Sequence, residues 1–468
     1  MARFDAVVIG GGPAGLAAAS LLATQGARTV LLDEQAAPGG QIYRAVQRAS
    51  PALLALLGAD YSHGAGLVDR FRASAAEWWP GSAVWQVTPE RAVWVSRDGC
   101  SEVLQAGVVV VASGAIERPV PVPGWTLPGA MTCGAVQILL KTAGLVAEGA
   151  VLAGSGPLLY LVAAQCIAAG ARPAAILDTA TRENARAARR HLPRALLGSI
   201  GRATLMKGFL LQAQIRASGT EWYRHVTDLV LEGEDAVEAV RFTCRGRQQR
   251  IATRLVALHE GIIPNQQITR SLGCAHEWDA AQRCFRPTLD DWGNTSLAGI
   301  LVAGDGGGII GARAAEHAGR IAAAEALRQL GRLDEAARDR LAEPERTGLA
   351  AQLAVRHFLD ARFAPPAQVL RPADEVVVCR CEEVRAGAVR AAVAQGCLGP
   401  NQAKSFLRAG MGPCQGRLCG PVVSELIAGA RGVGLEEVGY YRIRPPLKPV
   451  TVGELAGVLP VFAACRET

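Results

Sequence analysis

Four of the twelve cysteines lie close together near the C-terminus, as the pairs Cys379–Cys381 and Cys414–Cys419. Four thiolates can hold a structural zinc ion or an iron–sulfur cluster. Structural zinc favours C-x-x-C pairs, whereas the first pair here is C-x-C and the second lies among glycines, in GMGPCQGRLCG. Backbone N–H groups at such glycines can bond the sulfurs of a cluster. The spacing and its surroundings therefore favour a cluster over zinc.

A second chemical feature is a glycine-rich turn near the N-terminus, in DAVVIGGGPAGLAAASLLA. The apolar run predicts a buried parallel strand, and the alanine-rich stretch predicts a helix. Between them lie Gly10, Gly12, Pro13, Ala14 and Gly15, the pattern G-x-G-x-x-G. Such glycines permit a tight turn and the approach of a pyrophosphate to the helix N-terminus. A glycine-rich turn of any α/β fold is the alternative, but the order of strand, glycines, helix, strand and acid favours dinucleotide binding.

The acid of this pattern follows the next apolar run, TVLL, where Asp33 and Glu34 are adjacent. A carboxylate at this point can hold the ribose hydroxyls of a dinucleotide. Both residues lie at about the expected distance in sequence after the glycine turn, so the choice between them stays open.

The same pattern recurs in AVLAGSGPLLYLVAAQCIAAGARPAAILD, with Gly154, Gly156 and Pro157 at the turn and Asp178 after the second strand. Leu159 stands where a third glycine is expected. A leucine there holds helix and strand further apart than glycine does. This segment is equally compatible with a working site for NAD or ATP and with a nucleotide fold that has only a structural role.

Two such folds in tandem resemble the two-dinucleotide flavoproteins of the glutathione-reductase type, which hold FAD in the first fold and NAD(P)H in the second. Other segments match that family: PGGQIYR, VVVVASGAIERP and GILVAGDGGG. The resemblance implies an α/β protein in which FAD contacts the glycine turn and Gly39, Gly40, Gln41, Ser113, Gly114, Gly304 and Asp305. It also implies a discontinuous FAD domain, residues 1–145 and 255–340, around an inserted NAD-like domain, residues 146–254.

No catalytic residue is assigned from the sequence. Disulfide reductases of this type need two neighbouring redox cysteines, and the chain contains no C-x-x-C. Cys133 stands alone and is expected to be a buried structural residue. His259 and Glu260 are candidate general bases, but a loop that returns the chain to the FAD domain is the preferred interpretation of their segment. Disulfide reduction is therefore disfavoured.

The C-terminal region resembles the bacterioferritin-associated-ferredoxin (BFD) type of domain, which binds one 2Fe–2S cluster through four cysteines. The resemblance implies that Cys379, Cys381, Cys414 and Cys419 are the ligands, within a small helical domain at residues 373–430. A helical connector is expected before it, at 341–372. An extended tail containing RIRPPLKP is expected after it, at 431–468.

Taken together, these parts resemble the larger flavoprotein subunit of heteromeric amine, imino-acid and opine dehydrogenases. That family includes opine oxidases, hydrogen cyanide synthase and the dehydrogenases of D-hydroxyproline and L-proline. The resemblance implies that the substrate is oxidised on a partner β subunit of the D-amino-acid-oxidase type, alongside which a small ferredoxin-like γ subunit can occur. Electrons then pass through the 2Fe–2S cluster and FAD of this α subunit to an acceptor.

Two other functions are compatible with the sequence. One is a self-sufficient NADH:acceptor reductase, with NADH at the Gly154 turn. The other is an assembly scaffold that holds ATP without turnover. The net charge of +7 is dispersed, so nucleic acid is not an expected partner. The apolar stretch 149–171 is interrupted by glycine, proline and glutamine, so we expect a cytoplasmic protein without a membrane span, at most peripheral to a membrane.

Overall fold

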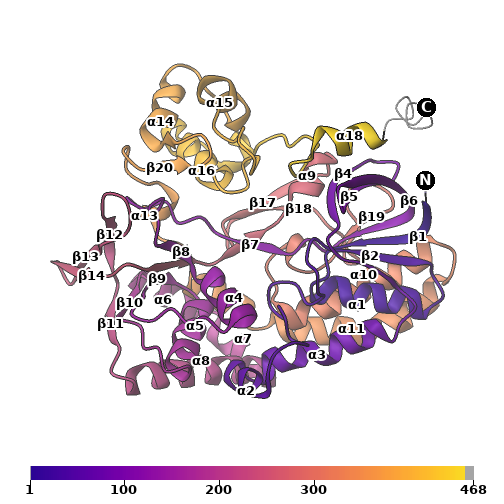
Figure 1. Cartoon of the computed structure of the whole chain (residues 1–468), viewed down its shortest axis with the longest axis horizontal. Coiled ribbons are helices and arrows are strands. Elements are labelled where there is room, and N and C mark those ends of the chain that lie inside the picture. Colours follow the sequence, from indigo (N-terminus) through magenta and orange to yellow (C-terminus); the bar gives the residue numbers. More distant parts are fainter. Residues whose placement is uncertain (1, 459–468) are drawn as a thin grey trace.

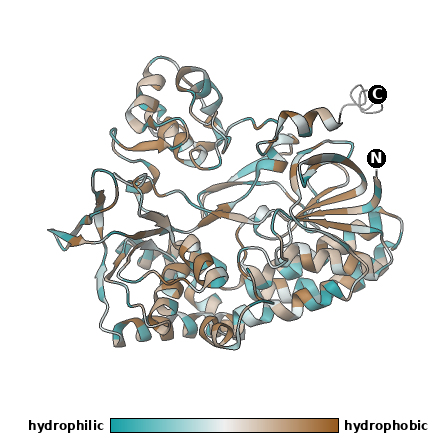
Figure 2. Cartoon of the chain, in the orientation of Figure 1, coloured by the Kyte–Doolittle hydropathy of each residue, from teal (hydrophilic) through white to brown (hydrophobic). Residues whose placement is uncertain are grey.

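The computed structural model describes residues 2–458, and a seven-stranded sheet forms its N-terminal part. The strand order is β3-β2-β1-β6-β5-β4, with β19 beside β6. The strands are β1 (Ala2–Ile9), β2 (Thr29–Leu32), β3 (Glu77–Trp79), β4 (Ala83–Val87), β5 (Ala92–Arg97), β6 (Cys100–Val111) and β19 (Ile300–Val302). Strands β2, β1, β6 and β19 are apolar and pair in parallel, as buried strands of nucleotide folds do. Figure 2 shows their hydrophobic colouring. Residues 300–302 thus join a sheet built from residues 2–111.

Helices rich in alanine and glycine pack on this sheet (Figure 1). They are α1 (Pro13–Thr24), α2 (Pro51–Leu57), α3 (Ala59–Arg72), α10 (Ala312–Gln329) and α11 (Glu335–Leu353). A Cβ at Gly319 of α10 would lie only 2.2 Å from the carbonyl oxygen of Ala14. Small residues therefore let α1 and α10 approach closely, which fixes the N-terminus of α1 against the strand ends.

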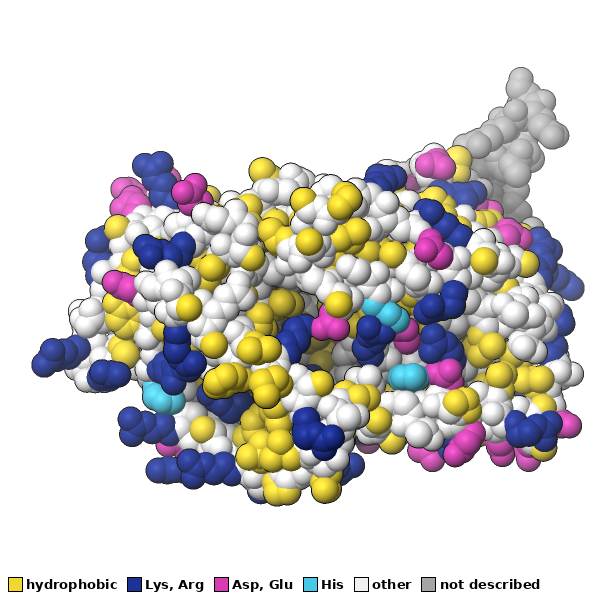
Figure 3. All heavy atoms as spheres, turned by 90° about the horizontal axis from the view of Figure 1, so that it is seen from below, with side chains coloured by type: hydrophobic (Ala, Val, Ile, Leu, Met, Phe, Trp, Pro, Cys, Tyr) yellow, Lys and Arg dark blue, Asp and Glu magenta, His cyan; other side chains and the backbone are white. Residues whose placement is uncertain are grey.

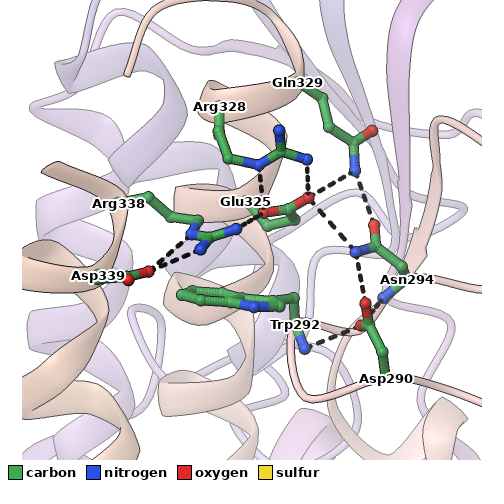
Figure 4. A network of polar contacts seen from close by, with 8 residues as sticks. All are labelled: Asp290, Trp292, Asn294, Glu325, Arg328, Gln329, Arg338 and Asp339. Carbon is green, nitrogen blue, oxygen red and sulfur yellow. Dashed lines mark hydrogen bonds and ion pairs between the residues drawn. The ribbon is translucent and has the colours of Figure 1, made fainter. Parts of the chain in front are cut away.

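A buried carboxylate holds α11 onto α10 (Figure 4). Glu325 accepts hydrogen bonds from Arg328 and from Arg338, the latter at 2.9 Å. Burial alone raises the pKa of Glu325, but the hydrogen bonds from its partners outweigh burial and lower the pKa to about 2. The guanidinium of Arg338 also lies 3.8 Å from the ring centre of Trp292. The expected boundary between residues 340 and 341 falls inside this tightly held α11.

A five-stranded parallel sheet follows, in the order β11-β10-β9-β15-β8. Its strands are β8 (Ala130–Thr132), β9 (Val151–Ser155), β10 (Ala175–Asp178), β11 (Glu221–Arg224) and β15 (Val256–Glu260). Its helices are α4 (Cys133–Ala143), α5 (Pro157–Ala168), α6 (Arg182–Arg189), α7 (Leu192–Leu197) and α8 (Ser199–Ala217). An antiparallel meander adds β12 (Thr227–Glu232), β13 (Ala239–Cys244) and β14 (Arg247–Ala252). Strands β8 and β15 flank the expected insert, 146–254, and join its sheet.

Short elements connect the two sheets. They are β7 (Ala115–Glu117), β16 (Ile262–Pro264), α9 (Gln267–Ser271), β17 (His276–Asp279), β18 (Cys284–Pro287) and the 3₁₀ turn η1 (Gly304–Gly307). Strands β7 and β16 pair antiparallel, so the chain leaves the first sheet and returns to it along the same path.

The cysteine-bearing region is a separate helical cluster above both sheets in Figure 1. After α12 (Arg356–Arg362) and α13 (Ala367–Leu370) come β20 (Val377–Cys379), β21 (Val384–Arg385), α14 (Ala386–Ala394), α15 (Pro400–Leu407), α16 (Gly420–Arg431) and α17 (Leu435–Val438). Buried Glu425 of α16 forms an ion pair of 2.6 Å with Arg283, and the indole of Trp125 donates to the carbonyl of Val377 at 2.7 Å. These contacts fix the helical cluster to the rest of the chain.

The tail that follows crosses from the helical cluster to the first sheet. Residues 439–450 form neither helix nor strand, and α18 (Val452–Val458) comes after them. The N–H of Leu447 donates to the carbonyl of Trp85 at 2.7 Å, and Lys448 lies 2.9 Å from Glu34. An irregular segment thus lies between the short helices α17 and α18, and the predicted tail, 431–468, stays a prediction as a whole. The last part of the expected tail, 459–468, lies outside the described residues.

Helix α8 presents an unusual surface. Only Gly201 and Ile215 of its nineteen residues are buried, while Met206, Phe209 and Leu210 are more than half exposed. Figure 3 shows hydrophobic side chains gathered on this face among Lys and Arg. Within residues 2–458, none of the helices has the length and apolarity that crossing a membrane requires.

Candidate functional site

The N-terminal glycine turn has the geometry that a pyrophosphate site needs. Gly10 has φ +109°, and a Cβ on it would lie 2.4 Å from the carbonyl oxygen of Ala112. A Cβ on Gly15 would lie 1.9 Å from the carbonyl oxygen of Gly10. Gly12 precedes α1 and has no side chain that could accept a hydrogen bond from the first N–H groups of the helix. These N–H groups therefore remain available to an anion.

The two adjacent acids after β2 have different surroundings. Asp33 accepts hydrogen bonds from the N–H groups of Gly11 and Gln35, and partial burial of its carboxyl raises its pKa. Glu34 is exposed and pairs with Lys448 of the tail. Asp33 therefore faces the turn, which favours it as the acid beside a ribose, whereas Glu34 anchors the tail.

The predicted second glycine contact lies directly against the first. The N–H of Gly39 donates to the carbonyl of Gly11 at 2.8 Å, and a Cβ on Gly40 would lie 2.8 Å from the Cα of Gly12. The side chain of Gln41 accepts from Arg44 at 3.0 Å. A hollow of about 350 Å³ lies beside this segment, lined by Pro38, Trp78 and neighbouring residues. Trp78 was not predicted as a site residue, because it lies on a strand far along the sequence.

The remaining predicted flavin residues lie at the same edge of the sheet. Ser113 donates to the carbonyl of Asn265 at 2.9 Å, and Gly114 accepts from the N–H of Asn265. A Cβ on Gly304 would lie 2.8 Å from the Cβ of Ala14. Desolvation by the surrounding protein raises the pKa of Asp305, which accepts from the N–H groups of Ile310 and Gly311. The structure thus gathers these glycines and acids around the N-terminus of α1, as an extended FAD would require.

The second glycine turn is filled by the protein's own side chains. A Cβ on Gly154 would lie 1.8 Å from the carbonyl of His259, and a Cβ on Gly156 would lie 3.0 Å from the His259 ring. His259 is itself buried and lies 2.9 Å from Glu117. The imidazole therefore covers the glycine at the point where a pyrophosphate would approach. Pro157 begins α5, and Leu159 is fully buried beneath it.

The acid of the second fold is also bonded internally. Asp178 accepts from the hydroxyl of Tyr160 at 2.8 Å and from the N–H of Ala180 at 3.0 Å. Neighbouring Glu260 accepts from Ser155 at 3.0 Å and from Thr179 at 2.6 Å. Burial raises the pKa of Glu260 to about 8. This buried network leaves Asp178 turned toward α5 instead of a ribose.

One expectation for this region is wrong. His259 and Glu260 do not lie in a loop; they are the last two residues of β15. Their partners Glu117, Ser155 and Thr179 were missed, because strand pairings between distant segments bring them together: β15 with β9, β9 with β10, and β16 with β7. Cys133 is buried with a pKa raised by burial, in keeping with the expected structural role.

The four C-terminal cysteines meet as two pairs. Cys379 and Cys419 are buried and share a thiol hydrogen bond, whereas Cys381 is exposed and contacts Cys414. The hydrogen bond with Cys419 is the largest cause that lowers the pKa of Cys379, to about 6, and it outweighs burial. Backbone N–H groups, including that of Gly410, contribute to the same lowering of the pKa. Within residues 2–458, no three His, Cys, Asp or Glu side chains converge on one point as a single metal ion requires. Two thiol pairs with N–H donors fit a two-iron cluster better than one tetrahedral zinc.

Aromatic residues of the tail cover the buried pair. Tyr441 is buried, and its hydroxyl lies 3.8 Å from the sulfur of Cys419. Tyr440 donates to the carbonyl of Gly416 at 3.2 Å. A Cβ on Gly412 would lie 2.2 Å from the Cβ of Cys381, so glycine is needed for this packing. Sequence reasoning missed both tyrosines, although they follow the cysteine region directly.

One short segment joins the flavin edge to the cysteines. Asn265 bonds Ser113 and Gly114, as described above, and two residues later Gln267 donates to the carbonyls of Cys414 and Gln415 at 3.5 and 3.3 Å. Residues 265–267 thus connect the two sites, because Asn265 bonds the predicted flavin residues and Gln267 bonds the loop of Cys414. The two sites are neighbours in space although they are about 300 residues apart in sequence.

Two family descriptions match the chain: "Pyridine nucleotide-disulphide oxidoreductase" over residues 4–326 and "BFD-like [2Fe-2S] binding domain" over residues 377–429. An opine oxidase component from Rhizobium meliloti (strain 1021) is 44% identical over 98% of this chain and 100% of its own length. Hydrogen cyanide synthase subunit HcnB of Pseudomonas protegens is 32% identical over 95% of this chain and 96% of its own.

Among solved structures, L-proline dehydrogenase from P. horikoshii matches with a TM-score of 0.68 over 97% of this chain and 79% of that chain. At 18% identity this match shows the fold alone. The predicted α/β class, with glutathione-reductase-type nucleotide folds and a small 2Fe–2S domain, is confirmed.

Proposed function

We infer the function from one premise: the chain belongs to the family of these opine oxidase and hydrogen cyanide synthase subunits, within the pyridine nucleotide-disulphide oxidoreductases. It is an oxidoreductase with FAD and a 2Fe–2S cluster as cofactors. Its relatives are subunits of larger enzymes, and this chain is the flavin and iron–sulfur subunit of such an assembly.

We propose that it is the electron-transferring α subunit of an FAD-dependent amino-acid, imino-acid or opine dehydrogenase. The observation that carries the proposal is the link through residues 265–267, which connects Ser113 to Cys414 by hydrogen bonds. FAD accepts two electrons and releases them singly, and the cluster carries one. A short, rigid connection between their sites suits transfer in single steps.

The residues proposed to hold FAD are those around the N-terminus of α1. The turn residues Gly10, Gly12 and Gly15 leave room for the pyrophosphate, and Asp33 holds the ribose. The helix N-terminus favours the negative charge. Gly39, Gly40, Gln41, Ser113, Gly114, Gly304 and Asp305 complete the proposed set, together with Pro13 and Ala14. The proposed ligands of the cluster are Cys379, Cys381, Cys414 and Cys419.

The substrate is proposed to be oxidised on a partner β subunit of the D-amino-acid-oxidase type, with opines, D-hydroxyproline and L-proline as candidate substrates. The exposed Met206, Phe209 and Leu210 of α8 support assembly with a partner, since apolar patches of this kind mark subunit contacts. A small ferredoxin-like γ subunit is a further candidate partner, and a cytoplasmic location is part of the proposal.

A self-sufficient NADH:acceptor reductase is the rival function. The His259 ring over Gly156 and the Tyr160–Asp178 hydrogen bond count against it, because they occupy the positions that a pyrophosphate and a ribose need. The same contacts count against ATP at Gly154, Gly156 and Pro157.

Co-expression with candidate β subunits tests the proposal. The purified assembly is mixed anaerobically with octopine, D-hydroxyproline or L-proline, and the visible spectrum and electron paramagnetic resonance are followed. We expect one substrate to reduce the cluster in the assembly and none to reduce this chain alone. Reduction of the isolated chain by an amine would overturn the proposal.

A further inference from the structure

The tail segment 441–444 alternates buried and exposed side chains. Tyr441 and Ile443 are buried, whereas Arg442 and Arg444 are exposed. Successive side chains of an extended backbone point to opposite sides, so the two arginines face the same way. The backbone of Arg442 is held on α15: its N–H donates to the Asn401 side chain at 2.7 Å, and Lys404 donates to its carbonyl at 3.0 Å.

The two arginines line an open hollow of about 810 Å³. Lys404 and Arg408 of the α15 region line it from the other side, and Met411 contributes an apolar surface. Four cationic side chains thus line one hollow together with exposed Met411. Arginine and methionine are both enriched at protein–protein contact surfaces.

The hollow lies beside the loop that carries Cys414. Its lining residues Gly410 and Gln415 bracket the loop that carries Cys414, and the N–H of Gly410 bonds Cys379. Arg408 lies 2.9 Å from Glu382, which directly follows Cys381. Cys381 is exposed and Cys379 is buried, so the thiol of Cys381 is the one of these two that solvent and a partner can reach.

The positive charge of the hollow is largely uncompensated. Arg408 has a carboxylate partner, but among residues 2–458 no carboxylate lies within 4.0 Å of Arg442, Arg444 or Lys404 in an ion pair. Burial and the nearby charge of Arg444 lower the pKa of Lys404, as expected for crowded like charges. An acidic surface would relieve this crowding.

We propose that this hollow is the docking surface for an acidic face of the redox partner subunit, which brings the partner's flavin to the exposed Cys381–Cys414 edge. The inference rests on the proposed function and adds where the partner binds and which chemistry it presents. One electron moves at a time: the reduced flavin of the partner loses it, the cluster gains it, and no covalent bond is made or broken.

Charge reversal tests the surface. The double variant Arg442→Glu/Arg444→Glu is compared with Arg182→Glu/Arg189→Glu, which changes the net charge equally on exposed positions of α6. Each oxidised holoprotein is mixed anaerobically with the β subunit, whose flavin has first been reduced by its amine substrate, in a stopped-flow instrument, and the rate of cluster reduction is measured at low and high ionic strength. We expect the first variant to associate at least about tenfold more slowly at low salt, with the difference vanishing near 1 M salt. The control should match the wild type.

Further measurements separate the outcomes. The visible spectrum of each variant must show the same flavin and cluster content as the wild type, which excludes misfolding, and Arg442→Gln/Arg444→Gln should give a smaller decrease. Equal association rates for the two double variants would overturn the docking surface while leaving the proposed function intact. Saturable binding of inorganic pyrophosphate that is lost in the variant, with partner association unchanged, would overturn it in favour of a small-anion site. A wild-type chain that combines with no β subunit would overturn the proposed function itself.

Discussion

The two glycine turns of this chain share one sequence pattern but have different surroundings. At the first turn, Asp33 accepts from the N–H of Gly11, and no side chain lies within 4 Å of a Cβ on Gly12, where the nearest atom is the Cα of Gly40 at 3.9 Å. At the second, the His259 ring lies against Gly156, and Tyr160 bonds Asp178. The glycines set the backbone of a nucleotide turn, but the side chains opposite them decide whether a nucleotide can enter.

The largest expected effect comes from Gly12→Ala. Gly12 has ordinary φ, and a Cβ there would lie no closer than 3.9 Å to another atom, so the protein should fold normally. The added methyl group would meet the pyrophosphate instead. We expect FAD affinity to fall by about 10³-fold, roughly 4 kcal/mol, measured by flavin fluorescence on titration of the apoprotein. Gly156→Ala at the second turn, where φ is +131° and a Cβ would lie 3.0 Å from the His259 ring, should lower stability but leave the flavin content of the folded protein unchanged. Equal flavin loss in both variants would contradict the proposed difference between the two glycine turns.

Glu260→Gln should alter the pH dependence of stability. The pKa of Glu260 rises from 4.5 to about 8 in the fold, so the folded state binds the extra proton between these values. Its contribution is complete below pH 4.5 and is lost as pH rises toward 8. We expect the glutamine variant to lose this slope and to gain up to about 4 kcal/mol of stability at pH 8 relative to wild type. Urea denaturation at a series of pH values measures it. An unchanged slope would mean that Glu260 is charged and the second turn is open to water.

Tyr160→Phe removes the hydroxyl that bonds Asp178. The carboxylate keeps the N–H of Ala180 but loses one buried partner, which should cost about 1–2 kcal/mol in thermal or urea denaturation. Flavin content should not change. A stability equal to wild type would show that water replaces the hydroxyl, contrary to a closed second site.

His259→Ala should have the smallest effect. The change removes the ring from Gly156 and makes room at the second turn. We expect NAD or ADP binding to increase by at most about tenfold, about 1.4 kcal/mol, because Asp178 still points to Tyr160. Isothermal titration calorimetry measures it. Tight binding of NAD to the unaltered protein would contradict the description of the second turn.

Much of this arrangement could be predicted from the sequence, because it depends on local patterns. The glycine turns, the strands before them and the spacing of Cys379, Cys381, Cys414 and Cys419 are all short-range signals. The contrast between Asp33 and Glu34 could not be predicted, since it depends on Lys448, more than 400 residues away. Likewise, His259 covers Gly156 only because β15 pairs with β9.

The tail illustrates the same limit. Its prolines predict an extended chain, and residues 439–450 are neither helix nor strand. Nothing local indicates that Tyr441 packs against Cys419, or that Arg442 and Arg444 line a hollow with Lys404. Those facts follow from how the tail lies across the cysteine region.

The most direct test of the contrast between the two turns is an anaerobic visible spectrum of the purified chain before and after excess NADH. The starting spectrum should show flavin bands with a broad iron–sulfur shoulder. We expect NADH to leave both unchanged and dithionite to bleach both, because the closed second turn admits no hydride donor and the chain receives its electrons from a partner. Rapid bleaching of the flavin by NADH would contradict this and establish a self-sufficient reductase.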